Sequence, residues 1–159
     1  MPLQWTRVDD YEAMSAAGAA RIAAALEPRL RQGRPALLGL ATGNTMLVLY
    51  QRLAELLNRR AASLAQLHTF NLDEYVGADG RWVPADHPLS YRAYMEQNFF
   101  SRLDPQLGLQ PDHVHFPDPA CPSETDDLIE RLGGLDVQLL GIGFNGHIAF
   151  NEPMPETEV

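Results

Sequence analysis

The side chains of this sequence that could move protons stand at the ends of short apolar runs. Asp73 and Glu74 close one such run, and His147 follows three glycines beyond another, with Glu152 five residues later. An imidazole or a carboxylate can move a proton near neutral pH, and a carboxylate beside an imidazole can fix its tautomer and raise its basicity. Asp73, His147 and Glu152 are therefore candidate catalytic residues. A solvated strand end remains the alternative for the Asp-Glu pair.

A polar turn, Thr42-Gly43-Asn44-Thr45, lies between an apolar run and a predicted helix. Backbone N–H groups at the start of a helix form an anion site, because the positive end of the helix dipole lies behind them. Gly43 permits a close approach of the chain to a ligand, and Thr45 can add a hydroxyl donor. The turn predicts a phosphate-binding loop, with a simple N-cap turn as the alternative.

The segment Gly141-Ile142-Gly143-Phe144-Asn145-Gly146 matches the pattern G-x-G-x-x-G after a predicted strand. A dinucleotide site would require a helix to open at these glycines and an acidic residue about 20 positions later. The residues from His147 to Pro153 are a poor helix opening, and the sequence ends before that spacing. We interpret the glycines as a turn in front of His147 rather than as a nicotinamide site.

Two further groups of residues are weaker candidates for a functional site. His113 and His115 would point to the same side of a strand, which suggests a metal site, with a solvated strand edge as the alternative. We predict no metal. Cys121 has no neighbouring base along the sequence that would activate it, so we expect it to be inert.

The elements that must position these residues alternate between helical and strand patterns. Helices are predicted from Asp9 or Asp10 to Arg31 and over Met46–Arg60, Ser90–Leu103 and Ser123–Leu132. Strands are predicted over Ala36–Leu40, His68–Leu72, His113–Phe116 and Asp136–Ile142. The inward side chains are expected to include Met14, Ile22, Leu26, Leu30, Leu49, Leu53 and Leu56. The tail from residue 145 to 159, which contains Pro153 and Pro155, should not be one regular helix.

This alternation predicts an α/β fold with a doubly wound, mainly parallel, Rossmann-like sheet, in one domain of residues 1–159. In such sheets ligands bind beyond the carboxyl ends of the strands, where the three candidate motifs lie.

Composition limits the function further. The 159 residues carry a net charge of −9, which disfavours nucleic acid as a partner. All 12 cationic residues are Arg, so this chain has neither a Schiff-base lysine nor a Walker-type phosphate lysine. The single cysteine allows no internal disulfide, and no leader or long apolar stretch is visible. We expect a soluble cytoplasmic protein that does not contact a membrane.

Four motifs, taken together and in this order, resemble the glucosamine-6-phosphate deaminase (isomerase) family. They are Leu38-Gly39-Leu40-Ala41-Thr42-Gly43-Asn44-Thr45, Phe70-Asn71-Leu72-Asp73-Glu74-Tyr75-Val76-Gly77, His87-Pro88-Leu89-Ser90-Tyr91 and Gly146-His147-Ile148-Ala149-Phe150-Asn151-Glu152-Pro153. Related 6-phosphogluconolactonases typically carry Asp-Glu-Arg at the strand end and Ser-Leu-Phe-Pro after Gly-His. This sequence has Asp73-Glu74-Tyr75 and Asn-Glu-Pro instead, which favours the deaminase over the lactonase.

The resemblance implies conversion of glucosamine 6-phosphate to fructose 6-phosphate and ammonia, without a metal or organic cofactor. His147 would open the sugar ring with Glu152 as its orienting partner, and Asp73 would move the proton from C2 to C1. The phosphorylated amino sugar would be held by Thr42, Gly43, Asn44, Thr45, Gly141 and Gly143. A sugar-phosphate-binding protein without catalytic activity is the alternative from another functional class.

Three features differ from the best-known members of this family. Asn145, also counted with the catalytic residues, stands where they carry Asp, so a neutral amide would replace a charged relay to His147. Asn44 is larger than the usual Gly or Ser and should crowd the phosphate. The sequence covers only the N-terminal part of the usual family length, as though truncated after a fourth strand.

The family's strand order, 3-2-1-4, would make Asp136–Ile142 an apolar edge strand. An unpaired apolar edge promotes association. We therefore expect that the native chain continues past Val159 or that this strand pairs with another copy in a homo-oligomer.

Overall fold

Four parallel strands form one sheet in the order β3-β2-β1-β4 in the computed structural model, which describes residues 4–60, 63–152 and 154. The strands are β1 (Ala36–Leu40), β2 (Leu67–Asn71), β3 (Val114–His115) and β4 (Val137–Gln138). At the centre Leu38 pairs with Thr69 of β2 on one side and with Val137 of β4 on the other. The predicted α/β class, parallel sheet and strand order are confirmed.

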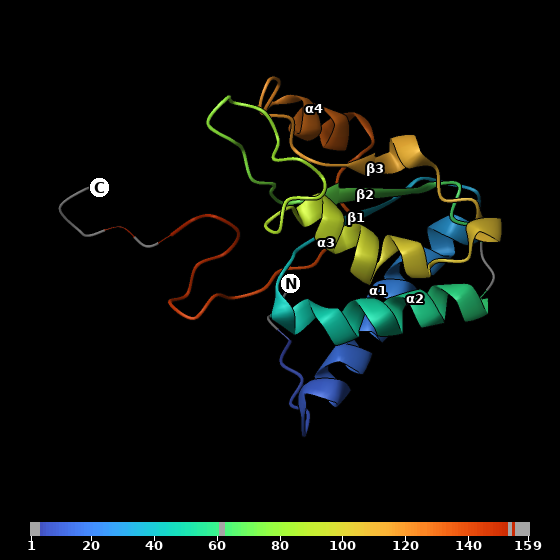
Figure 1. Ribbon diagram of the computed structural model, residues 1–159. Coiled ribbons are helices and arrows are strands. Elements are labelled where there is room, and N and C mark those ends of the chain that lie inside the picture. Colours follow the sequence, from blue (N-terminus) through green and yellow to red (C-terminus); the bar gives the residue numbers. More distant parts are fainter. Residues whose placement is uncertain (1–3, 61–62, 153, 155–159) are drawn as a thin grey trace.

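Helices cover both faces of this sheet (Figure 1). The helices α1 (Tyr11–Arg31), α2 (Leu47–Arg60) and α3 (Tyr91–Asn98) lie on one face, and α4 (Glu124–Arg131) lies on the other. The 3₁₀ turns are η1 (Asn44–Met46), η2 (Phe100–Arg102), η3 (Pro105–Leu107) and η4 (Pro111–His113). A search of the described residues finds no helix with the length and apolar character needed to span a bilayer.

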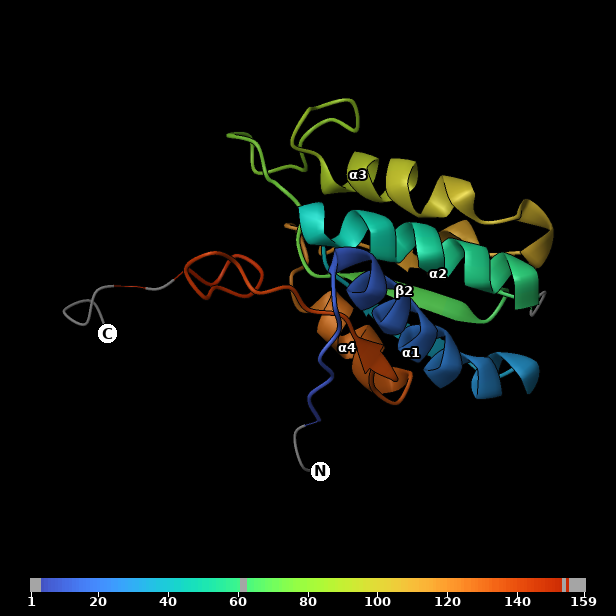
Figure 2. The same ribbon diagram turned by 90° about the horizontal axis from the view of Figure 1, so that it is seen from below.

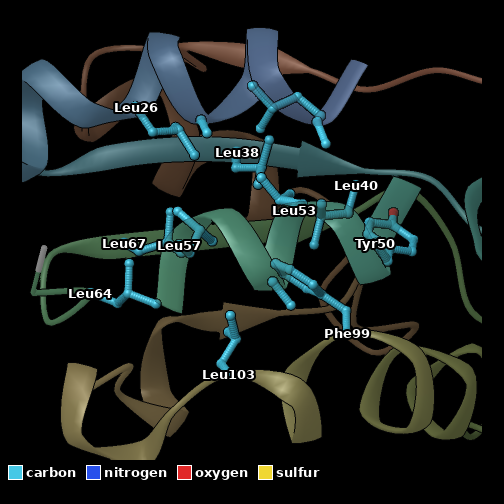
Figure 3. Close-up of a cluster of buried hydrophobic side chains, with 14 of the residues drawn as sticks. Leu26, Leu38, Leu40, Tyr50, Leu53, Leu57, Leu64, Leu67, Phe99 and Leu103 are labelled. Atoms are coloured by element: carbon cyan, nitrogen blue, oxygen red, sulfur yellow. The ribbon is translucent and has the colours of Figure 1, made fainter. Parts of the chain in front are cut away.

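The helix layer packs on alternate residues of β1. Leu38 and Leu40 face Leu26 of α1, Leu53 of α2 and Phe99, which follows α3 (Figure 3). All five residues of β1 are buried, as a central parallel strand requires. Because β1 is buried along its whole length, the start of the loop that follows it at Ala41 has a fixed position.

The helix starts were predicted more accurately than the inward faces. Asp10 caps α1 by accepting a hydrogen bond from the Ala13 amide at 2.7 Å, as predicted. Met14, however, is 44% exposed, and the neighbouring Ser15 is buried instead. The first turns of α1 are rich in alanine, so two rotations of the helix about its axis would bury similar apolar areas. Packing against α2 decides which of the two faces points inward.

The fourth strand is much shorter than predicted. Only Val137 and Gln138 are in β4, so the predicted strand Asp136–Ile142 is too long. The strand lies at the edge of the sheet, as predicted, and the apolar residues Leu140 and Ile142 that follow it are 46% and 80% exposed. Strand pairing ends where the Leu139 amide donates to the Gly39 carbonyl at 2.9 Å. Beyond this point the chain turns away toward the carboxyl ends of the strands (Figure 2).

Three histidines meet on the face of the sheet that carries α4. The His113 ring stacks on His68 with centroids 3.7 Å apart, and His68 Nδ1 lies 3.4 Å from His115 Nε2. The His68 and His115 rings are nearly parallel, at 7°. Within the described residues no group of three or more His, Cys, Asp or Glu side chains is arranged to hold a metal ion.

The histidine cluster predicts a loss of stability on mild acidification. Burial, together with the charges of His113 and His115, lowers the pKa of His68 from 6.5 to about 4, although Asp112 acts in the opposite direction. The unfolded chain therefore binds more protons than the folded chain between pH 6.5 and about 4, and stability falls as pH decreases through that range. Urea unfolding of wild type and His68→Phe across this range measures the effect.

The His68→Phe comparison removes one titrating group and leaves the others common to both proteins. We expect the stability difference between wild type and variant to change with pH over this window. Parallel curves for the two proteins would contradict the prediction.

Candidate active site

A pocket of about 360 Å³ opens at the carboxyl ends of β1, β2 and β4. It lies at the point where the chain, having built the sheet outward from β1 to β3, returns to add β4 on the other side of β1. Such a switch point is where open α/β sheets bind ligands. The walls are formed by Ala41, Thr42, Gly43, Thr45, Leu72, Asp73, Tyr75, Tyr91, Gly141, Ile142, Gly143, His147, Ala149, Phe150 and Glu152.

Most of the residues predicted for the site line this pocket. Asn44 and Asn145 are the two that do not. Asn44 is exposed outside the pocket wall, so the expectation that its side chain crowds a phosphate is not supported. Asn145 acts on the pocket through His147, as described below.

The loop after β1 presents backbone and hydroxyl groups to the pocket. Gly43 has φ 119°, a conformation that a residue with a Cβ rarely adopts, and the 3₁₀ turn η1 and helix α2 follow it directly. Thr42 and Thr45 also form part of the wall. The loop therefore offers N–H and O–H donors at a helix start, and no Arg forms part of the wall among the described residues.

Asp73, at the end of β2, faces the pocket. Burial, and then the nearby charge of Glu74, raises the pKa of Asp73 from 3.8 to about 6. A carboxylate with this pKa is mostly ionised at neutral pH and still holds a proton well enough to return it to a substrate. Asp73 is thus suited to carry a proton between two neighbouring atoms of a ligand.

Glu74 has a different role from its neighbour. Its side chain is fully buried and accepts hydrogen bonds from the amides of Tyr75, Tyr91 and Arg92 at 2.8 to 2.9 Å and from the Ser90 hydroxyl at 3.1 Å. Burial alone would raise the pKa of Glu74, but these donors outweigh it and hold the pKa below its usual value. Glu74 therefore fastens the end of β2 to the start of α3, and the solvated strand end considered above does not describe it.

His147, Asn145 and Glu152 form a connected group in the segment after β4. Asn145 Oδ1 lies 2.6 Å from His147 Nδ1, and Asn145 Nδ2 donates to Glu152 Oε2 at 2.7 Å. Glu152 Oε1 is 3.0 Å from the same His147 nitrogen. Two acceptors facing Nδ1 place the proton there, which leaves Nε2 free to act as a base.

The neutral amide of Asn145 fits this arrangement better than a carboxylate would. An Asp at this position could accept from His147 but could not donate to Glu152, and the two carboxylates would repel. Here Glu152 supplies the negative charge beside His147. Glu152, which the resemblance implied as the orienting partner of His147, thus lies in contact with it.

The glycines around His147 form a tight turn and not a dinucleotide loop. The Gly146 amide donates to the Gly143 carbonyl at 3.0 Å, and the Gly143 amide donates to the His147 carbonyl at 2.9 Å. No helix follows these glycines among the residues described up to 152. The interpretation of the segment as a turn is confirmed.

Gly143→Ala should move His147 out of place. A Cβ on Gly143 would lie 2.3 Å from the Cε1 and Nε2 atoms of the His147 ring, so the ring must leave its position beside Asn145 and Glu152. We expect at least a roughly tenfold fall in turnover, since a displaced acid or base loses much of its catalytic contribution. Steady-state release of ammonia from glucosamine 6-phosphate, the substrate that the resemblance implies, measures this effect.

Gly141→Ala is the matched comparison for this prediction. Its Cβ would meet only the mobile end of Met46, at 3.0 Å, so the effect should be smaller. Because Gly141 also lines the pocket, the comparison is made on kcat and not on KM, and equal losses of kcat in the two variants would contradict the role of Gly143 in seating His147.

Three aromatic side chains of the pocket were not predicted as site residues. The rings of Tyr75, Tyr91 and Phe150 lie with centroids 5.0 to 5.9 Å apart and connect the end of β2, the start of α3 and the segment after β4. Burial is the main cause that raises the pKa of Tyr91 to about 12, so its hydroxyl stays protonated. All three stand inside motifs quoted above, and their place in those motifs was the available signal.

A doubly wound sheet with a polar pocket at its switch point, lined by a carboxyl group of raised pKa and a histidine, is the arrangement in which open α/β proteins bind small polar ligands. The family model described as glucosamine-6-phosphate isomerases/6-phosphogluconolactonase matches residues 9–150. The chain belongs to this family.

Named relatives agree with the family assignment. The chain is 43% identical over 131 residues to a glucosamine-6-phosphate deaminase of Hahella chejuensis, covering 79% of this chain and 47% of the relative. It is 42% identical over 150 residues to one of a Geobacillus species, covering 91% and 55%. The chain thus spans about half the length of the curated relatives it matches.

Solved structures give the same picture. A monomeric glucosamine-6-phosphate deaminase superposes with a TM-score of 0.78 and 34% identity, over 97% of this chain and 61% of that one. A 6-phosphogluconolactonase of Shewanella baltica superposes with a TM-score of 0.61 and 21% identity, over 90% and 58%, and this likeness shows the fold alone.

Proposed function

We propose that this chain is the N-terminal part of a glucosamine-6-phosphate deaminase and carries its catalytic residues. The enzyme converts glucosamine 6-phosphate to fructose 6-phosphate and ammonia in amino-sugar catabolism. The observation that carries the proposal is the meeting of Asp73, the 42–45 loop and the His147 group in one pocket. The deaminase names of relatives about 40% identical support the choice within the family.

His147 acts first in the proposed reaction, in opening the pyranose ring. Its free Nε2 takes the proton of the anomeric hydroxyl, and the resulting imidazolium gives that proton to the ring oxygen as the bond between this oxygen and C1 breaks. Glu152 and Asn145 keep Nδ1 protonated and oriented and stabilise the positive charge that forms on the imidazole. The product of this step is the open-chain aldehyde.

Asp73 then moves the proton between carbons. Its carboxylate removes the proton from C2 and returns it to C1, while a proton of the amino group passes to the C1 oxygen. C2 thereby becomes an imine and C1 becomes a CH2OH group. Water adds to this imine, and ammonia leaves to give the ketone of fructose 6-phosphate. A base with a pKa of about 6 serves both directions of this transfer near neutral pH.

The 42–45 loop is the proposed phosphate anchor. Backbone amides and the hydroxyls of Thr42 and Thr45 would hold the phosphate, and Gly141 and Gly143 would let the sugar lie close to the chain on the opposite wall. Binding of the non-reacting phosphate orients C1 and C2 against Asp73.

Three measurements separate this proposal from its two alternatives: ammonia release, thermal protection by the sugar phosphate and lactone hydrolysis. A 6-phosphogluconolactonase would hydrolyse a sugar lactone, and a silent binder would bind sugar phosphate without turnover. We expect ammonia release from glucosamine 6-phosphate, coupled to the formation of fructose 6-phosphate. Thermal protection by the sugar without ammonia would overturn the enzyme proposal in favour of a binder, and lactone hydrolysis alone would favour the lactonase.

We include a cytoplasmic location in the proposal. The single cysteine, Cys121, is exposed and has no second cysteine with which to form an internal disulfide. A homo-oligomer remains part of the proposal as well, to be tested by light scattering.

A further inference from the structure

Three tyrosine hydroxyls hold the carbonyl groups of the loop after β1. Tyr94 of α3 donates to the Gly43 carbonyl at 2.7 Å, and Tyr11 of α1 donates to the Asn44 carbonyl at 3.0 Å. Tyr50 of α2 donates to the Ala41 carbonyl. The three hydroxyls therefore come from three different helices and bind three carbonyls within four residues of the chain.

None of these tyrosines lines the pocket, whereas Gly43 and Thr45 do. The carbonyls of Gly43 and Asn44 are therefore held by groups outside the pocket wall. In a trans peptide the C=O and the following N–H point in opposite directions, and no cis peptide occurs in the described residues. Fixing the carbonyls of Gly43 and Asn44 outward therefore turns the amides of Asn44 and Thr45 the other way.

The surrounding contacts strengthen this arrangement. Tyr11 Oη also accepts a hydrogen bond from the Val48 amide, at 3.4 Å, so the same hydroxyl connects the loop to the first turn of α2. Tyr50 is fully buried, and Tyr94 is half-buried, with burial as the main cause that raises the pKa of Tyr94 to about 12. Burial also raises the pKa of Tyr50, so both hydroxyls are protonated and able to donate near neutral pH.

From this geometry we infer that Tyr11 and Tyr94 are positioning residues that hold the carbonyls of Asn44 and Gly43 away from the phosphate group of the substrate, so that amides of the loop face it, while Tyr50 fixes the start of the loop at Ala41. The inference rests on the proposed function, in which this loop anchors the phosphate. A loop free to rotate could turn a carbonyl toward the anion, which would repel it. Because the peptide groups are already oriented before the phosphate binds, the entropic cost of ordering the loop on binding is small.

The absence of a cation from the described pocket wall makes the orientation of the amides more important. No Arg side chain lines the pocket among residues 4–60, 63–152 and 154, and the sequence contains no Lys. Within this part of the chain the phosphate depends on N–H and O–H donors, whose strength depends on direction.

The test uses Tyr94→Phe and Tyr11→Phe, which remove one hydroxyl each and keep the ring. Inorganic phosphate is titrated into the ¹⁵N-labelled chain, and the amide shifts of Asn44 and Thr45 report both the site and the dissociation constant. We expect each variant to bind phosphate roughly fivefold more weakly, the loss typical of one hydrogen bond, and the double variant to lose more. Where turnover is measured, KM should rise and kcat should stay nearly constant.

Trp82→Phe is the matched control. Trp82 also donates from an aromatic side chain to a backbone carbonyl, that of Pro117 at 2.7 Å, but this bond lies outside the loop. The Trp82→Phe variant should bind phosphate with the same affinity as wild type. Tyr11 is 41% exposed, so its variant keeps the fold even where the Tyr94 variant is destabilised.

The outcomes separate the two proposals. If phosphate does not shift the Asn44 and Thr45 amides of wild type, the phosphate anchor of the proposed function fails, and this inference fails with it. If wild type binds there and both variants bind equally well, the tyrosine inference alone is overturned. A lower melting temperature with an unchanged phosphate affinity would likewise reduce the tyrosines to structural residues.

Discussion

Asp73→Asn should lower the turnover of glucosamine 6-phosphate by about three orders of magnitude while leaving its binding nearly unchanged. The amide keeps the shape of the carboxylate but cannot take a proton from C2. Because Asp73 is one wall residue among many, the remaining contacts still hold the ligand. Ammonia release gives the rate, and thermal protection by the sugar phosphate gives the binding.

The pH dependence gives this prediction a second measurement. Since the proposed mechanism requires Asp73 as a carboxylate, kcat/KM of wild type should fall as pH decreases through about 6, the raised pKa of this side chain. The residual activity of Asp73→Asn should lack this acidic limb. Asp86→Asn, which changes an exposed acidic residue of the loop before α3, is the control and should behave as wild type. Retention of most of the activity in Asp73→Asn would remove Asp73 from the proton transfer.

His147→Gln should slow the reaction of the closed sugar by about two to three orders of magnitude, because it removes the base that opens the ring. Glutamine can still accept or donate hydrogen bonds toward Asn145 and Glu152, so the turn around it should persist. Proton exchange at C1 or C2 of an acyclic substrate analogue depends on Asp73 and should be affected much less.

Two measurements on the same variant test the division of labour between His147 and Asp73. Turnover of glucosamine 6-phosphate reports the whole sequence of steps, and deuterium incorporation from solvent into the acyclic analogue reports the later ones. His87→Gln, in the loop before α3, is the matched control. Equal slowing of both rates by His147→Gln would exclude His147 from ring opening.

Much of the site was predictable because its parts follow strands. Short runs that are apolar on both faces predict buried parallel strands, and the polar residues after them must then meet at one edge of the sheet. This reasoning brought Asp73, the 42–45 loop and His147 together before any contact was known, and the pocket contains all three. The helix starts followed from short-range chemistry, as at Asp10 and Ser90, whose side chains accept from amides three residues later.

The extent of the fourth strand was less predictable. The run from Asp136 to Ile142 has the composition of a buried strand, but pairing stops after Leu139 because β1 ends at Leu40 and offers no further partner. Strand length depends on the neighbour in the sheet, which the composition of the run does not contain.

The sequence by itself determined the class of fold, the order of the motifs and which end of the sheet carries the chemistry, because these depend on local patterns of apolar and polar residues. Only the tertiary structure decided the separate roles of Asp73 and Glu74, which are neighbours of the same chemical type. Glu74 is a structural carboxylate because its partners, at Ser90, Tyr91 and Arg92, lie 16 to 18 residues away. The tyrosines that donate to carbonyls of the loop after β1 are up to 51 residues from it, and contacts across such distances arise only when separate elements pack together.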